Sequence, residues 1–126
     1  MTDTKPLALI IEDNEDQNLI FTTALTQAGY ATESIRDGTV ALDRLNAVTP
    51  TMVILDLHVP GVNGGVILRE IRKAPRTQNA HVIIVSADAE FASSLQAQVD
   101  LVLLKPVSFS QLSHLASRYI KESKSP

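Results

Sequence analysis

The sequence has no cysteine, few aromatic residues and no long apolar run. Without cysteine there is neither a disulfide scaffold nor thiolate chemistry, and a reducing compartment fits this composition. Aromatic residues make up 4% of the chain, so the core must rest on Val, Ile, Leu and Ala. No apolar run approaches the length needed to span a bilayer, and residues 1–6 lack the apolar stretch of a signal peptide. We therefore expect a cytoplasmic protein without membrane contact.

Neither acidic nor basic residues dominate the chain. The net charge is -3 and there is no basic block, which argues against direct binding of nucleic acid. With 126 residues, 44% of them hydrophobic, the chain is long enough for one ordinary core. We expect a single domain over residues 1–126 with its core over about 6–121. Met1 and the short lead favour a natural start, and residues 122–126 indicate a frayed tail or a linker stub.

Short apolar runs and helical patterns alternate along the chain. Continuous runs rich in β-branched residues are typical of strands buried on both faces of a parallel sheet, and they lie at 7–11, 52–57, 81–86 and 101–104. A weaker alternating stretch over 31–35 predicts an edge strand. Helical periodicity is found at 15–28, 39–47, 64–73 and 109–121. This alternation predicts an α/β fold of right-handed βαβ units with helices on both sheet faces.

The helical patterns also predict which side chains face the core. In the first helix these are Leu19, Ile20, Thr23, Ala24 and Leu25. In the second they are Val40, Ala41, Leu42 and Leu45. Gly29 is expected to end the first helix, and Ser108 or Ser110 to cap the last one.

Oxygen and ammonium groups stand at or just past the ends of four predicted strands. They are Glu12, Asp13, Asp56, Ser86 and Lys105. Because the carboxyl ends of parallel strands share one sheet edge, where ligands bind, we expect these groups to converge on one shallow pocket. Three carboxylates, a hydroxyl and an ammonium suit Mg²⁺ together with a phosphoryl group.

Taken alone, each of these residues has an ordinary structural explanation. The adjacent acids Glu12 and Asp13 also fit a solvated loop, and Ser86 a helix N-cap. Lys105 would project from the sheet edge and pair with Asp56, which is a plain ion pair by itself. Asp56, however, ends a strongly apolar run. Because apolar surroundings do not stabilise a carboxylate, another group must stabilise the charge of Asp56.

The segments that follow Asp56 and Lys105 must turn sharply. Pro60 indicates a turn in the first loop. Pro106 is a candidate for a cis peptide bond, which would fix the direction of the turn in the second loop. His58 is either a general base or, as we prefer, a loop histidine whose backbone carbonyl matters more than its ring. The two other histidines, His81 and His114, are expected to be structural or surface residues.

Four motifs, in this order, resemble those of the receiver domain of bacterial two-component response regulators. They are Ile11-Glu12-Asp13-Asn14, Asp56-Leu57-His58-Val59-Pro60-Gly61, Val85-Ser86-Ala87 and Leu104-Lys105-Pro106. The resemblance covers nearly the whole chain, roughly residues 6–121. It implies a flavodoxin-like (CheY-like), doubly wound, five-stranded parallel sheet with strand order 2-1-3-4-5.

The resemblance also implies roles for individual residues. Asp56 would accept a phosphoryl group from a histidine kinase or a histidine phosphotransfer protein. The Mg²⁺ ligands would be Glu12, Asp13, Asp56 and the backbone carbonyl of His58. The groups that bind the phosphoryl oxygens and carry the switch would be Ser86, Ala87 and Lys105. Such a domain catalyses only its own phosphorylation and dephosphorylation.

The phosphorylated state of such a domain would alter its protein–protein contacts. The partner would be a downstream protein, an attached output domain, or a second copy in a phosphorylation-dependent dimer.

The chain departs from the family pattern in its switch region. Val102 stands where the family usually has an aromatic residue, and a stiff β-branched side chain has no large inward and outward states to exchange. The segment between Ser86 and Lys105 is short, so a fourth helix over 89–96 is expected to be short, shifted or mobile. His58 and Asp88 lie where water would approach the phosphoryl group, so we expect them to tune dephosphorylation.

Two other functions stay open at this point. A receiver-like interaction module that phosphorylation does not control would fit the altered switch region. A Mg²⁺-dependent phosphatase of a related α/β fold would need a second acid just past the nucleophile, where His58 stands, and a substrate cap.

Overall fold

Five short strands of mostly Val, Ile, Leu and Ala form one parallel sheet. The computed structural model describes residues 5–124, with side chains as far as Ile120. The strands are β1 (Leu7–Ile11), β2 (Ala31–Ile35), β3 (Met52–Leu55), β4 (His81–Ser86) and β5 (Leu101–Leu104). Their order in the sheet is β2-β1-β3-β4-β5, and every neighbouring pair is parallel. The predicted CheY-like topology is confirmed.

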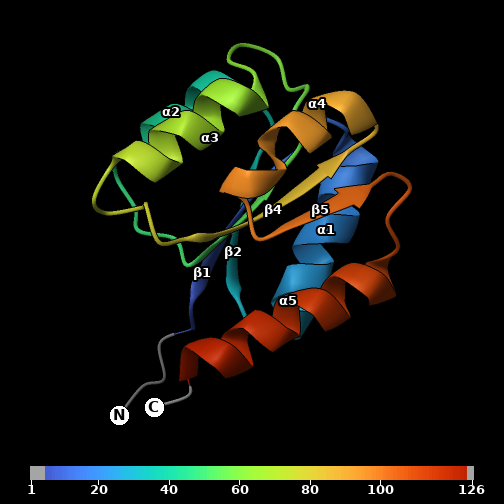
Figure 1. Cartoon of the computed structure of the whole chain (residues 1–126). Helices are drawn as coiled ribbons and strands as arrows, with labels where there is room; N and C mark the ends of the chain where they lie inside the picture. The colour runs from blue at the N-terminus through green and yellow to red at the C-terminus, as the bar shows by residue number, and fades with distance from the viewer. Residues whose placement is uncertain (1–4, 125–126) are drawn as a thin grey trace.

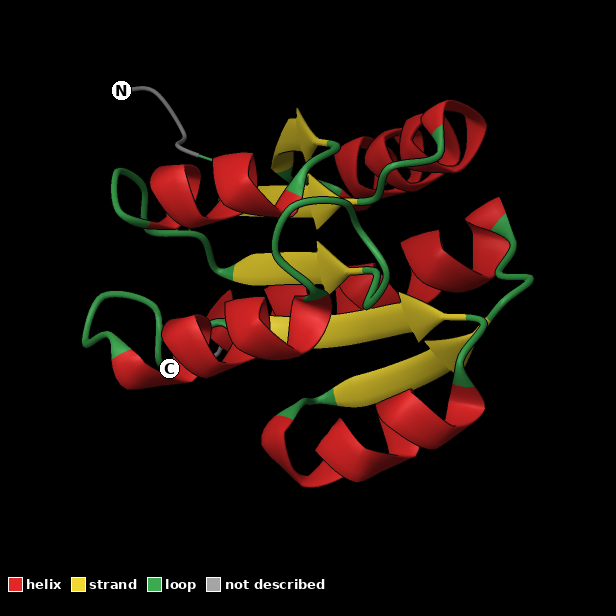
Figure 2. Ribbon diagram, turned by 90° about the horizontal axis from the view of Figure 1, so that it is seen from above, coloured by secondary structure: helices red, strands yellow, loops and turns green. Residues whose placement is uncertain are grey.

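Helices cover both faces of this sheet. They are α1 (Glu15–Ala28), α2 (Gly38–Leu45), α3 (Gly64–Lys73), α4 (Ala89–Leu95) and α5 (Phe109–Lys124). α1 and α5 pack on one face, and α2, α3 and α4 pack on the other (Figure 1). Because every neighbouring pair of strands is parallel, the carboxyl ends of the strands form a single edge, toward which most of the strand arrows in Figure 2 point. None of the helices within residues 5–124 has the length and apolar character needed to cross a membrane.

Side-chain caps start four of the helices at that same edge. The capping residues, each of which accepts a hydrogen bond from a backbone N–H of its helix, are Asn14, Asp37, Asn63 and Asp88. At the other end of α1, Gly29 adopts a φ of 114°, a left-handed conformation that costs glycine little, and it is the predicted C-cap. The Ser108 hydroxyl accepts from the N–H of Gln111 and caps α5, which settles the choice between Ser108 and Ser110.

The predicted core-facing side of α1 is wrong in part. Leu19 and Ile20 are 66% and 41% exposed, and Thr23 is exposed as well. The buried residues of α1 are Asn18, Phe21, Ala24 and Leu25. Apolar side chains occur on two sides of this helix, and packing against α5 buries the side that carries the large Phe21 ring. The same correction applies to Val40 of α2, which is 47% exposed.

Several predicted boundaries shift by a few residues. α2 covers Gly38–Leu45, where helix was predicted over 39–47. α5 continues to Lys124. The prediction of a frayed tail over residues 122–126 is therefore wrong for residues 122–124, which are helical. The rest of that tail, 125–126, lies outside the described residues, as does most of the short lead, 1–4.

The fourth helix is short, as predicted. α4 has 7 residues and runs into a 3-10 turn, η1 (Gln96–Gln98), before β5 begins. Arg72 of α3 holds this connection, because its guanidinium donates to the carbonyls of Gln98 at 2.9 Å and Ala80 at 2.6 Å. The mobility of α4 stays a prediction.

The Tyr30 hydroxyl provides a test of how α5 is attached. It is buried and donates to the carbonyl of Ala116 at 3.0 Å. Burial, and to a lesser degree the phenol of Tyr119, raises the pKa of Tyr30 to about 12 from its ordinary 10.0. Since the folded pKa is raised, this contribution to stability is fully present below pH 10.0 and is lost as the pH rises through about 12.

We expect Tyr30→Phe to lower the free energy of unfolding at neutral pH by about 1 kcal/mol, the typical net value of one hydrogen bond. Urea titration measures this loss, and ultraviolet absorbance follows the ionisation of the phenol. Ionisation of Tyr30 at the ordinary pKa of 10.0 would contradict the assignment.

Candidate functional site

Three carboxylates from two neighbouring strands meet at the carboxyl edge of the sheet. Glu12 and Asp13 follow β1, and Asp56 follows β3. One oxygen from each carboxylate lies within 4.8 Å of the other two. Glu12 and Asp56 are buried, whereas Asp13 is more exposed. Carboxylate oxygens at this spacing are the donors that a hard cation such as Mg²⁺ prefers, so the residues present fit that ion.

Lys105 brings a positive charge to this acidic cluster from β5. Its ammonium lies 2.7 Å from Oε1 of Glu12 and 3.3 Å from Oδ2 of Asp56. Burial opposes the charge of Lys105, but its contacts with Glu12 and Asp56 outweigh burial and raise the pKa of the ammonium. The predicted contact with Asp56 is confirmed, while the shorter contact with Glu12 was not predicted.

The carboxyl of Glu12 is not fully stabilised by the protein alone. Burial raises its pKa, the bonds from Lys105 and from the N–H of Asn14 at 3.1 Å lower it, and the charge of Asp56 raises it again. The net direction is upward. A divalent cation beside Glu12 would lower the free-energy cost of keeping this buried carboxylate ionised.

Ser86 is the last residue of β4, the strand between β3 and β5, and Asp88 lies in the loop that follows it. Ser86 is fully buried, and its hydroxyl accepts from the N–H of Asp88 at 3.0 Å. Asp88 caps α4 by accepting from the N–H of Phe91 at 3.0 Å, so Ser86 is not the N-cap of this helix. Ala87 between them is exposed.

His58 uses its backbone and its ring for different contacts. The backbone N–H donates to Oδ1 of Asp56 at 3.2 Å. The ring is 60% exposed and places Nε2 at 2.8 Å from Oδ2 of Asp88. The bond from Phe91 and then the bond from His58 lower the pKa of Asp88. That carboxylate is therefore ionised at neutral pH and accepts only, which puts the hydrogen on Nε2 of His58.

The remaining predicted positions lie on β5, just past it, or at the start of β4. The Val102 side chain is half-buried and packs into the core on the α2, α3 and α4 side of the sheet. The peptide bond between Lys105 and Pro106 is cis. His81 is half-buried against the ring of Tyr119, with Nδ1 at 3.3 Å from Asp100, which fits a structural role.

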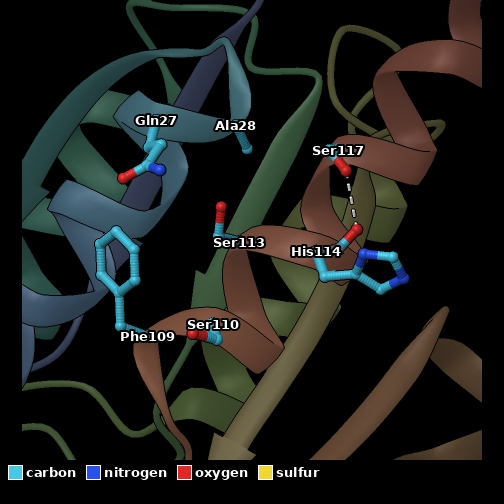
Figure 3. A pocket seen from close by; sticks show the side chains of 7 residues that line it. All are labelled: Gln27, Ala28, Phe109, Ser110, Ser113, His114 and Ser117. Atoms are coloured by element: carbon cyan, nitrogen blue, oxygen red, sulfur yellow. Dashed lines mark hydrogen bonds between the residues drawn. The ribbon is translucent and has the colours of Figure 1, made fainter.

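A separate cavity of 420 Å³ lies between the end of α1 and the start of α5 (Figure 3). Its lining residues are Gln27, Ala28, Phe109, Ser110, Ser113, His114 and Ser117. The Ser117 hydroxyl is satisfied by the carbonyl of His114 at 2.8 Å. No carboxylate, lysine or arginine is among the lining residues, so this cavity shares none of the chemistry of the acidic cluster.

Comparison with known proteins points to one family. The family model described as the response regulator receiver domain matches residues 8–117. The probable methanogenesis regulatory protein FilR2 of Methanothrix harundinacea is 30% identical over 117 residues, which are 84% of this chain and 76% of that protein. The regulator of RpoS of Escherichia coli is 34% identical over 111 residues, 82% of this chain but 32% of that protein.

A solved structure shares the fold at lower identity. The receiver domain of the sensor histidine kinase PA1611 from Pseudomonas aeruginosa superimposes with a TM-score of 0.82 at 23% identity. The match covers 94% of this chain and 99% of that one.

Asn18 of α1 is a positioning residue that the sequence patterns did not reveal. Its side chain is buried, and its amide donates to the carbonyls of Glu12 at 2.8 Å and Ile35 at 3.3 Å. Its oxygen accepts from the hydroxyls of Thr22 and Ser34. Asn18 thus ties the main chain at Glu12 to the end of β2. Asn18 stands at helical spacing from Phe21 and Leu25, and a polar side chain on the apolar side of a helix indicates a buried group that needs hydrogen-bond partners.

We expect Asn18→Leu to lower the free energy of unfolding by about 1–3 kcal/mol, because the Glu12 carbonyl loses the buried hydrogen bond from the Asn18 amide. It should also weaken Mg²⁺ binding, since the main chain at Glu12 is no longer held. Urea unfolding and calorimetric titration with Mg²⁺ measure the two effects. Tyr30→Phe, which acts away from the acidic cluster, is the control for destabilisation alone. Unchanged Mg²⁺ affinity in Asn18→Leu would limit Asn18 to a structural role.

Proposed function

This chain belongs to the response regulator receiver domain family, and on that premise we propose that Asp56 is a phosphoacceptor whose phosphorylation controls protein–protein contacts. One observation carries the proposal. The buried Asp56 carboxylate lies in a cluster with Glu12 and Asp13, and the ammonium of Lys105 is 3.3 Å from its Oδ2. Two further acids and a cation around a nucleophilic carboxylate match the needs of phosphoryl transfer.

The reaction we propose is a displacement at phosphorus. A carboxylate oxygen of Asp56 forms the new O–P bond while the bond between phosphorus and the donor breaks. The electron pair of that bond leaves with the donor, which is a phosphohistidine nitrogen or the oxygen of a small phosphodonor. The N–H of His58 orients the carboxylate through Oδ1, and Lys105 balances the charge of the phosphoryl oxygens. In this proposal Ser86 hydrogen-bonds the phosphoryl group, and the backbone at Ala87 lies beside it.

Mg²⁺ is the cofactor that we propose for this site. Glu12, Asp13, Asp56 and the backbone carbonyl of His58 would hold the ion. When bound, it would supply neutralisation of phosphoryl charge. The acidic cluster supports this assignment. So does the likeness to the PA1611 receiver domain, whose structure is described with a magnesium ion coordinated in the active site cleft.

The partners follow from the same proposal. A histidine kinase or histidine phosphotransfer protein would supply the phosphoryl group. The response would pass to a downstream protein, an attached output domain or a second copy of the chain. This chain spans a third of the regulator of RpoS and three quarters of FilR2, so its relatives differ in what accompanies this domain. We retain as proposals that residues 1–126 form a single receiver domain and that it works in the cytoplasm.

The alternative of an interaction module without phosphorylation control rests on Val102. A half-buried valine packed in the core has no exposed state to exchange with, so the family's aromatic switch is absent. Phosphorylation that occurs without a change in structure would favour this alternative.

Intact-mass measurement after incubation with acetyl phosphate and Mg²⁺ tests the phosphoacceptor. We expect a single phosphoryl adduct on the wild-type protein and none on Asp56→Asn, because the amide is not a nucleophile of comparable strength. Asp88→Asn, which also replaces one carboxylate by an amide near the pocket, is the matched control and should still form the adduct. An adduct of equal yield on Asp56→Asn would contradict the assignment of Asp56 as the phosphoacceptor.

His58 and Asp88 stand where water approaches the phosphoryl group, so we expect each of these side chains to hinder the attacking water and slow hydrolysis of phosphorylated Asp56, whether or not the two contact each other. We predict that His58→Ala and Asp88→Ala each shorten the lifetime of the phosphorylated protein by about 2–5-fold, the effect expected from loss of one exposed electrostatic contact. The decay of the adduct after removal of the phosphodonor measures this lifetime. The hypothesis fails when both variants decay at the wild-type rate.

A further inference from the structure

A side-chain bridge spans the two loops that border the phosphoryl pocket. His58 lies two residues after Asp56, Asp88 lies two residues after Ser86, and their side chains meet at 2.8 Å. In the protein with a free Asp56, this contact ties the β3–α3 loop to the β4–α4 loop. We call the contact between His58 and Asp88 the bridge.

The bridge is continuous with the start of α4. One carboxylate oxygen of Asp88 bonds His58, while the other caps α4 through the N–H of Phe91. The His58 ring also contacts the Phe91 ring, with centroids 5.7 Å apart and planes tilted by 59°. The far end of the Phe91 ring lies against the backbone of α3 at Gly65, where a Cβ would come within 3.1 Å of it. Asp88 and Phe91 therefore link His58, α4 and α3 in one contact chain.

Both ends of the bridge are attached to groups that a phosphoryl group on Asp56 would engage. The N–H of His58 donates to Oδ1 of Asp56, one of the two oxygens available for the new bond. The hydroxyl of Ser86 accepts from the N–H of Asp88, so movement of Ser86 toward a phosphoryl oxygen pulls on Asp88. α4 has 7 residues and one fully buried side chain, Ala92, while Phe91 and Leu95 are half-buried against the same core.

We propose that the bridge is a latch, closed while Asp56 is free and opened when Asp56 carries a phosphoryl group, and that its opening releases Phe91 from Gly65 and reorients α4. This inference deepens the proposed function and rests on it. It assigns to His58, Asp88 and Phe91 the coupling that Val102 cannot provide. The bridge lies on the pocket side of α4, so the signal reaches the helix at its first turn without passing through β5.

Nuclear magnetic resonance of the full chain tests the latch, with beryllofluoride and Mg²⁺ as a stable mimic of the phosphoryl group. In the wild type, the mimic should move the Gly65 amide resonance, because the Phe91 ring leaves it, and should speed hydrogen exchange at α4 amides about 5–10-fold. In Asp88→Ser without the mimic, the Gly65 resonance should already lie toward the position of the bound wild type. Serine still caps a helix but is too short to reach His58.

Two further variants complete the test. His58→Ala changes an exposed side chain, keeps the fold intact and should reproduce the Asp88→Ser shift. Val102→Ala should respond to the mimic as the wild type does. The latch is overturned when the mimic binds but leaves Gly65 and α4 unchanged, or when Val102→Ala alone abolishes the response. Failure of the mimic to bind, together with no adduct from acetyl phosphate, would overturn the proposed function, and the latch with it.

Discussion

The structure depends on keeping three carboxylates and one ammonium together at the edge of a largely apolar sheet. Glu12 and Asp56 are 1% and 6% exposed, a state that carboxylates reach only beside compensating groups. Lys105 supplies one compensating charge, the N–H groups of Asn14 and His58 supply hydrogen bonds, and the remaining negative charge favours a divalent cation. The parallel strand order makes this arrangement possible, because it brings the ends of β1 and β3 side by side.

Much of the fold could be predicted from local patterns. The strands were found because runs such as 7–11 and 81–86 are buried on both faces and contain little else than apolar residues. The strand order came from the family resemblance, since no local pattern contains it. The buried side of α1 was not predictable in the same way. Leu19 and Ile20 are as apolar as Phe21, and only packing against α5 decides which side is covered.

The positions of the site residues at the strand ends were predictable from the sequence, whereas the contacts between their side chains were not. The edge positions of Glu12, Asp13, Asp56 and Lys105 follow from topology. The contact between Lys105 and Glu12 needs long side chains that reach across the ends of β4 and β3. The role of Asn18 depends on carbonyls at the ends of two strands. The contacts of His58 with Asp88 and Phe91 join residues that are far apart in sequence, so hydrophobic periodicity along the chain does not predict them.

The central claim is that phosphoryl transfer takes place at Asp56 in this acidic cluster. The most direct measurement is reduction of the phosphorylated protein with borohydride, followed by peptide mapping by mass spectrometry. An acyl phosphate is reduced to an alcohol by this hydride donor, whereas free carboxylates are not. The account predicts conversion at position 56 alone, and only when Mg²⁺ was present during phosphorylation. Conversion at another carboxylate, or the same yield at position 56 with Mg²⁺ chelated, would contradict it.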